Sequence, residues 1–455
     1  MSDQKTHNDA IKEKMMVIAS PILTDLDSRA EIKGSRDPLG IQAIWTSYGH
    51  KVVSNLTTVS TSVVDFKATL IGYAIAQHAS NHGIGDGDLP MFLKWEQLAA
   101  YARYKVNNET SFRGTQRTQK YLSESDRVTL SADLDCQILS NQKTYGLAGL
   151  YTSPTKASGL LEGNPPRLTA PARQFVDDYL MPNFQSQTSL TLDLLVRKIV
   201  PKRVTLKLDG QDMGLLEAIG KLLAKPFAEM EKEFYRRHIL WTQNPEDDVL
   251  GPQRILAQAM YALSPNSPFV LSPNRILELA QACESYGEAG RLLSKKLQQI
   301  RTCEFLIAPA VALFGLLLRS DGQRLEDVVE GLRQRWEQPP PTIDLAATEA
   351  QKGEFSAALR SADAAHRWMK IAGALAAGAY DTVFHLLFEQ NRDVMNNRNG
   401  TAPWIAIREG RIEVRYEETD SPAVPDGDRL RDFWVHPYFL PTVHAISLEL
   451  DGEAA

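Results

Sequence analysis

One apolar run limits the possible folds of this chain more than any other feature. Phe305–Leu318 carries no charge across fourteen positions and is flanked by Glu304 and Arg319. A segment of this length is too short to span a bilayer as a helix, which needs about 20 residues. We therefore expect it to be the central buried helix of the C-terminal half. Proline is tolerated near the start of a helix, so Pro309 is expected in its first turn.

A second informative stretch is Gln137–Val176, where signals for short elements follow one another closely. Its first part predicts an apolar helix through four residues, Ile138, Tyr145, Leu147 and Leu150. Ser153-Pro154 then predicts the start of a short helix that ends at Gly159. Leu160-Leu161 and Leu168 flank a Gly-Asn-Pro-Pro turn, which predicts a hairpin. Thr169 is placed to cap a helix that begins at Ala170, with Pro171 in its first turn.

This order of elements resembles the wing hairpin and following helix of winged-helix proteins of the MarR or PadR kind. The resemblance covers about forty of the 455 residues. It implies a DNA-binding module, and it names no family for the whole chain.

Length and composition favour a mainly α, multi-domain protein with a winged-helix-like module and a C-terminal β-hairpin. Hydrophobic residues make up 43% and charged residues 23% of the chain, which is typical of globular proteins. Gln338–Pro341 predicts a stiff linker, and residues 1–35 a leading helix and loop. We expect four regions: 1–90, helical; 91–210, the winged-helix-like basic module; 211–338, helical; and 342–455, helical with the hairpin and an aromatic tail.

Basic residues cluster around this module although the chain has a net charge of −6. Phosphate contact requires such local clusters of Lys and Arg. We therefore expect duplex DNA as a partner. The candidate nucleic-acid-binding residues are Arg103, Lys105, Arg113, Arg117, Lys120, Lys143, Lys156, Arg167, Lys202 and Arg203. The strand predicted from Val204 to Leu208 has one polar face, which also fits a solubilised edge strand.

Searches for catalytic and metal-binding patterns give no assignment. The nucleophile elbow, the dinucleotide-binding glycine motif, HExxH and paired cysteine ligands are absent from the sequence. His78 and His82, followed by Asp86 and Asp88, lie in a glycine-rich loop that we expect to be metal-free. Three distant cysteines predict reduced, mostly buried thiols. We expect no catalytic residue, no metal and no cofactor.

The C-terminal part predicts a hairpin followed by an aromatic segment. Residues 404–408 and 411–416 alternate around Glu409-Gly410, which is typical of a β-hairpin. Trp434, Tyr438 and Phe439 concentrate large apolar area near the chain end, so they are candidate partner-binding residues. The alternative is that they pack on the hairpin within their own domain.

Three classes of function remain. The first is a non-enzymatic DNA-binding or scaffold component of a bacterial multi-protein assembly that processes nucleic acid, with genome maintenance or anti-phage defence as the setting. The second is a transcriptional regulator with a large helical body, and the third is a metal-dependent enzyme with an unrecognised site. The first implies other protein subunits as partners and leaves a homo-oligomer open. The N-terminus has no apolar core of signal-peptide length, so we expect a cytoplasmic protein without a membrane partner.

Overall fold

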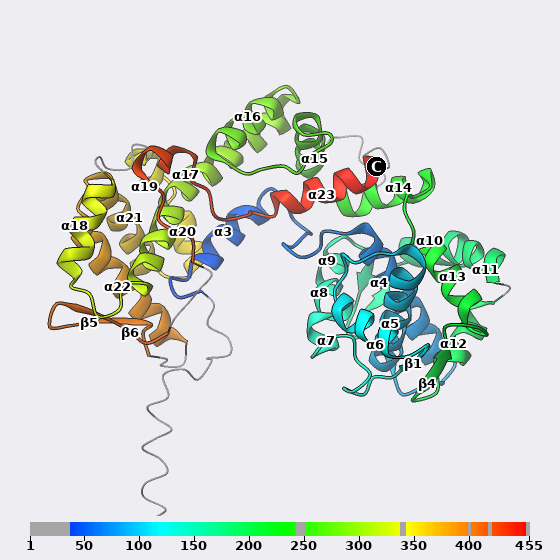
Figure 1. Cartoon of the computed structure of the whole chain (residues 1–455). Coiled ribbons are helices and arrows are strands. Elements are labelled where there is room, and N and C mark those ends of the chain that lie inside the picture. The colour runs from blue at the N-terminus through cyan, green and yellow to red at the C-terminus, as the bar shows by residue number, and fades with distance from the viewer. Residues whose placement is uncertain are drawn as a thin grey trace, which may run out of the picture. The chain divides into compact units, whose positions relative to one another are not determined.

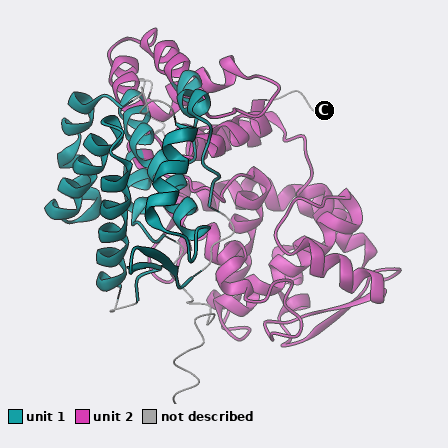
Figure 2. Cartoon of the chain, turned by 60° about the vertical axis from the view of Figure 1, so that its left-hand side comes forward, with its two compact units in different colours: residues 1–48, 272–276, 298–436 teal, residues 49–271, 277–297, 437–455 magenta. Residues whose placement is uncertain are grey.

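The chain is mainly helical, with short antiparallel strand pairs (Figure 1). The computed structural model describes residues 37–188, 190–242, 251–336, 343–398, 402–416 and 421–451. The predicted leading segment 1–35 and the linker Gln338–Pro341 lie outside these ranges. The chain divides into two compact units, coloured separately in Figure 2. Unit 1 comprises Met1–Tyr48, Ser272–Ile276 and Gln298–His436, and unit 2 comprises Gly49–Leu271, Leu277–Leu297 and Pro437–Ala455.

Unit 2 contains most of the elements that surround the predicted basic module. Its α-helices are α4 (Val63–Asn81), α5 (Asp88–Asn107), α6 (Thr115–Glu124), α7 (Gln142–Tyr145), α8 (Leu147–Leu150), α9 (Thr152–Ala157), α10 (Ala170–Phe175), α11 (Met181–Thr188), α12 (Leu192–Ile199), α13 (Met213–Leu222), α14 (Glu229–Tyr235), α15 (Pro252–Leu263), most of α16 (Pro273–Glu284) and α23 (Leu440–Asp451). Two π-helices, η1 (Val176–Leu180) and η2 (Arg236–Leu240), continue α10 and α14. Its strands are β1 (Arg127–Leu130), β2 (Leu161–Glu162), β3 (Arg167–Leu168) and β4 (Val204–Lys207).

The core of unit 2 is built on α4 and α5. Both helices are buried along most of their length and on nearly every side, as helices enclosed by neighbours are. The Trp95 indole N–H on α5 donates to the carbonyl of Ala68 on α4 at 2.8 Å, so even this polar group is satisfied inside the core. The helix α5 packs against both α4 and α13. Elements before and after the predicted region boundaries at residues 90 and 210 therefore share one core.

Unit 1 is a helical layer with a small hairpin. Its elements are α3 (Ile41–His50, to Tyr48), the second part of α17 (Gly287–Leu318), α18 (Leu325–Arg335), α19 (Leu345–Glu349), α20 (Lys352–Leu359), α21 (Ala362–Ala376), α22 (Tyr380–Asn397), β5 (Ile405–Arg408), β6 (Arg411–Val414) and the 3-10 helix η3 (Gly427–Asp432). The helix α21 packs against α20 and α22. The predicted C-terminal hairpin is confirmed, because β5 and β6 pair around Glu409 and Gly410. Both turn residues have positive φ, of 52° and 75°, as a two-residue hairpin turn requires.

The uncharged run lies in a longer helix than the sequence predicted. It forms the end of α17, which begins at Gly287, so the prediction that Pro309 lies in the first turn of a helix is wrong. Burial outweighs the missing proline N–H here, since Leu306, Ile307 and Ala310 are fully buried. Among the described residues, α17 is the one helix long and apolar enough to cross a membrane, and 78% of its most apolar stretch is buried. Such burial is typical of the core helix of a globular protein.

The stretch Gln137–Val176 forms short elements in nearly the predicted order. The predicted apolar helix is instead two single-turn helices, α7 and α8, because the chain breaks at Gly146. The short helix α9, the β2–β3 pair and α10 follow at the predicted places. Thr169 lies at the N-cap of α10, but its hydroxyl donates to the carbonyl of Gly159 instead of capping the helix.

Candidate nucleic-acid interface

Three of the predicted cations lie on α6 or directly before it, and this helix is fixed against the chain that leads into α7. Arg113 and Lys120 are exposed, and Arg117 is half-buried. The Arg117 guanidinium donates to the carbonyls of Gln137 at 3.1 Å and Leu139 at 3.0 Å. Beside it, the Ile138 carbonyl and side chain lie about 3 Å from where a Cβ on Gly114 would stand. Arg117 therefore contacts residues 137–139, and Arg113 directly precedes the glycine that packs against Ile138.

A buried glutamine network holds that connecting segment in place. The Gln97 amide donates to the Ser131 carbonyl at 2.7 Å and to the Gln142 side chain at 3.1 Å. The Gln137 amide donates to the Ala132 carbonyl at 2.8 Å, and its oxygen accepts the Gln142 backbone N–H at 2.9 Å. All three glutamines are buried. Because satisfied buried networks are rigid, the first turn of α7 has a fixed position, from which Lys143 reaches solvent.

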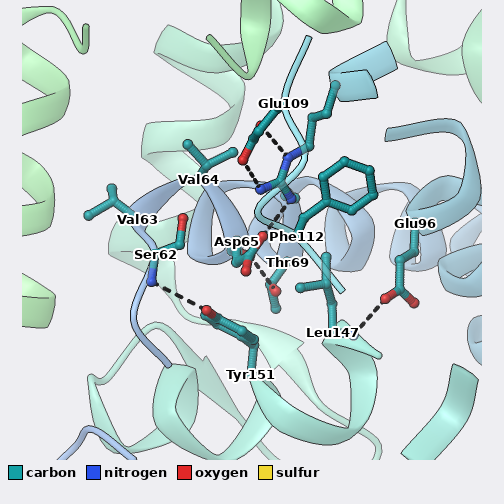
Figure 3. A network of polar contacts seen from close by, with 12 residues as sticks. Ser62, Val63, Val64, Asp65, Thr69, Glu96, Glu109, Phe112, Leu147 and Tyr151 are labelled. Carbon is teal, nitrogen blue, oxygen red and sulfur yellow. Dashed lines mark hydrogen bonds and ion pairs between the residues drawn. The ribbon is translucent and has the colours of Figure 1, made fainter. Parts of the chain in front are cut away.

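A buried carboxylate supports the junction between α7 and α8. Glu96 accepts hydrogen bonds from the Leu147 backbone N–H at 2.7 Å and from the Gln142 amide at 2.8 Å. Figure 3 shows Glu96 directed at Leu147. A Cβ at position 146 would stand 2.5 Å from this carboxylate, so only glycine fits there. Burial raises the pKa of Glu96 to about 7, and the two hydrogen bonds lower it by less.

Replacing Glu96 by glutamine should make stability depend less on pH. The pKa of Glu96 is raised in the folded protein, so the stability that this group contributes is present at low pH and is lost as pH rises through about 7. Glutamine stays neutral throughout. We expect a smaller loss of unfolding free energy between pH 5 and pH 8 in Glu96→Gln than in the wild type, measured by chemical denaturation. Glu217→Gln on the exposed face of α13 is the control and should keep the wild-type loss. An unchanged loss in Glu96→Gln would contradict this role.

Arg103, predicted as a nucleic-acid contact, does not belong to the exposed set. Its side chain is 4% exposed, and its guanidinium donates to Asp65 at 2.5 Å and to both oxygens of Glu109 at 2.8 and 2.6 Å. The ring of Phe112 lies under the guanidinium at 4.7 Å. Figure 3 shows these groups around the start of α4. The guanidinium joins α4, α5 and the chain after α5, and it is not available to a ligand.

The residues before β4 extend the α6 surface. Arg203 is exposed and bound to Asp133 and Asp135, each at 2.9 Å. The Tyr121 hydroxyl on α6 donates to the Asp135 carbonyl at 3.1 Å, so this loop contacts both β4 and α6. Lys202 is exposed and has no ion-pair partner within the described ranges. Figure 1 shows α6, α7, β1 and β4 at the same end of unit 2.

The strand pair β1–β4 adds two cations that were not among the predicted contacts. The predicted polar face is confirmed: Thr205 and Lys207 are exposed, while Leu206 is buried. The partner strand β1 places Arg127 directly opposite Lys207. Like charges directly opposite one another destabilise a strand pair. The sequence alone does not show that the strand containing Arg127 pairs with the strand containing Lys207.

The hairpin cations lie elsewhere. Lys156 donates to the Gly163 carbonyl at 2.7 Å, and Arg167 pairs with Asp88 at 3.5 Å. Asp88 begins α5, whereas the exposed Lys105 lies near its end, about 26 Å away at the usual helical rise. The structure therefore does not bring Lys105 together with Arg167.

The histidine loop next to α5 shows ordinary structural contacts. The His78 ring nitrogen Nε2 lies 3.3 Å from Asp193, and His82 Nδ1 donates to the His78 carbonyl at 2.8 Å. Within the part of the chain that the structure describes, no group of three His, Cys, Asp or Glu side chains is arranged to hold a metal ion. The three cysteines are free and buried, as predicted.

The C-terminal aromatic residues separate into two groups. Tyr438 and Phe439, both predicted as partner-binding residues, are buried inside unit 2. The Phe439 ring stacks on His50 with centroids 4.4 Å apart. Trp434 belongs to unit 1 and is half-buried, and its indole N–H donates to the His436 carbonyl at 2.6 Å.

Comparison with known proteins adds no relative. No protein-family model, curated protein or solved structure matches this chain.

Proposed function

We propose that this chain is a non-enzymatic DNA-binding component of a multi-protein assembly that processes nucleic acid. Its DNA-binding face would be the α6–α7 surface, defined as Arg113, Arg117, Lys120, Lys143, Lys202 and Arg203. One observation carries the proposal. Arg113, directly before the N-cap of α6, and Lys143, on α7, are both exposed, and neither has a carboxylate partner within the described residues.

The distribution of charge supports this proposal. The whole chain has a net charge of −6, so this group of cations is opposite in sign to the overall charge of the protein. A DNA backbone attracts such cations and releases bound counterions when they contact phosphates. A phosphate would also offset the repulsion between Arg127 and Lys207 on the adjoining strand pair.

The proposal further includes a winged-helix-like module formed by α7–α10 and β2–β3. The observed order of helix, hairpin and helix supports it. The helix α9 has six residues and so measures about 9 Å, which leaves little length for reading bases in a major groove. We therefore propose that phosphate contact dominates and that binding has little sequence preference.

Charge reversal tests the proposed face. The variant Arg113→Glu, Lys143→Glu, Lys202→Glu should bind a short mixed-sequence DNA duplex more weakly than the wild type. Each lost phosphate contact should reduce the log-log salt slope by roughly one. Fluorescence anisotropy across a salt series measures both quantities, and thermal melting checks that the variant is folded.

A matched control reverses three exposed cations elsewhere: Arg291→Glu, Lys295→Glu, Lys370→Glu. It changes the net charge by the same amount and should bind like the wild type. Equal weakening in both variants would show a general charge effect and overturn the proposed face. If the wild type does not bind at about 50 mM salt, where non-specific contacts are favoured, DNA binding itself is overturned.

A further inference from the structure

One aromatic side chain stands out on the α6–α7 surface. Among the described residues, the strongly exposed large apolar side chains include a single aromatic one, Tyr145, which is 53% exposed. It lies on α7, two residues after Lys143. No ring stacking or side-chain hydrogen bond links it to another described residue. An exposed aromatic ring next to cations is the combination used to bind unpaired nucleic-acid bases.

The backbone that carries this ring is firmly held. The Tyr145 N–H donates to the Asn141 carbonyl at 2.9 Å, and the Asn141 side chain accepts from the Thr144 N–H at 3.1 Å. Before Tyr145, the buried Gln142 is part of the glutamine network, and after it, the Leu147 N–H donates to the Glu96 carboxylate at 2.7 Å. The ring therefore extends into solvent from a fixed turn. A pre-organised contact loses less entropy on binding than one on a loose loop.

We propose that Tyr145 stacks on an unpaired base, so that the preferred ligand of this surface is single-stranded DNA. This inference depends on the proposed DNA-binding function and adds the form of the ligand. Charge complementarity supports it, because Arg113 and Arg117 lie beside the segment that leads into α7 and Lys143 lies on α7 itself. These cations would contact phosphates on a strand whose base covers the ring.

An intact duplex would gain little from Tyr145. Its bases are stacked on one another, and only their edges and the phosphates are accessible in the grooves. A single strand presents the faces of its bases, and every base can stack on an aromatic ring whatever its sequence. The cations would therefore act on both forms of DNA, whereas the ring would favour the single strand.

Substitution of Tyr145 tests this preference. Tyr145→Ala should weaken binding to an oligo-dT strand about tenfold, the usual scale for losing one base-stacking contact, and should leave binding to a duplex unchanged. Tyr145→Phe keeps the ring and should bind oligo-dT like the wild type. Leu134→Ala is the control, since Leu134 is an apolar side chain 73% exposed in the nearby loop before α7. It should have no effect on either ligand.

The outcomes separate this inference from the proposed function. If the wild type binds both forms of DNA and Tyr145→Ala affects neither, or weakens both equally, the stacking role is overturned and the proposed function stands. If Tyr145→Ala keeps its affinity for oligo-dT but loses a protein subunit on size-exclusion chromatography, the ring binds protein and the inference is also overturned. If neither form of DNA binds at about 50 mM salt, the proposed function itself fails.

Discussion

Replacing Arg103 by methionine should lower the unfolding free energy of unit 2 by about 3 kcal/mol, the lower end of the usual cost of breaking a buried ion pair. The substitution would leave the Asp65 and Glu109 carboxylates without their shared guanidinium partner. Asp65 lies in the buried first turn of α4, whereas the Glu109 side chain is 21% exposed and regains some water. Hydrogen exchange of the α4 and α5 peptides measures the effect within unit 2.

Two further variants show whether the cost comes from uncompensated buried charge. Arg203→Met breaks two exposed ion pairs, which solvent screens, and should lower the unfolding free energy much less than Arg103→Met does. Adding Asp65→Asn and Glu109→Gln to Arg103→Met removes both unpaired charges and should recover part of the loss. If Arg103→Met and Arg203→Met have equally small effects, the network in Figure 3 has no special role in stability.

Arg103 also shows why burial of charged residues was not predictable from the sequence. Its partners Asp65 and Glu109 lie 38 and 6 residues away along the chain. Before the fold is known, an arginine near the end of a helix reads as a surface residue, because unpaired charges are almost never fully buried. Only the packing of α4 against α5 brings the three side chains together. The same holds for Glu96, whose partners are 46 and 51 residues away.

Local signals predicted the hairpins better than they predicted the contacts between distant segments. The β5–β6 pair follows from alternation around Glu409-Gly410, because register and turn are both specified within a few residues. The β2–β3 pair follows from the leucines that flank a turn. By contrast, Thr129 of β1 meets Thr205 of β4, 76 residues away. The polar face of β4 was therefore predictable, but the cation opposite Lys207 was not.

The exposure of Tyr145 was not predicted, because the helix expected from the sequence is broken in the structure. The sequence placed it on one apolar helix with Ile138, Leu147 and Leu150. The break at Gly146 divides that helix in two, so the spacing does not continue across it. Leu147 is buried as the pattern predicts, whereas Tyr145 points into solvent. At this break the Leu147 N–H donates to Glu96, 51 residues away, so the contact joins two segments that no local pattern relates.

The second large effect is expected at the C-terminal aromatic segment. Phe439→Ala should lower the unfolding free energy of unit 2 by about 3–5 kcal/mol, the usual loss when a large core side chain is truncated. Phe439 is 4% exposed, and its ring lies 2.8 Å from where a Cβ on Gly49 would stand. Tyr438 and Phe439 both have positive φ, of 46° and 62°, a conformation that bulky residues adopt only when packing compensates the strain. The sequence offered partner binding as the role of this segment, whereas the burial of both side chains favours a role in the core of unit 2.

The anchoring of α23 explains why this loss should spread through unit 2. Phe439 directly precedes α23, whose Glu449 accepts from the backbone N–H groups of Val63 at 3.0 Å and Val64 at 3.3 Å, at the start of α4. Loosening the entry to α23 should therefore weaken the end of α4 that also holds Asp65. Hydrogen exchange in α4 should rise in Phe439→Ala and stay unchanged in the control Val270→Ala, whose side chain is 75% exposed. If Phe439→Ala keeps wild-type exchange but loses a protein partner on size-exclusion chromatography, partner binding is the correct role after all.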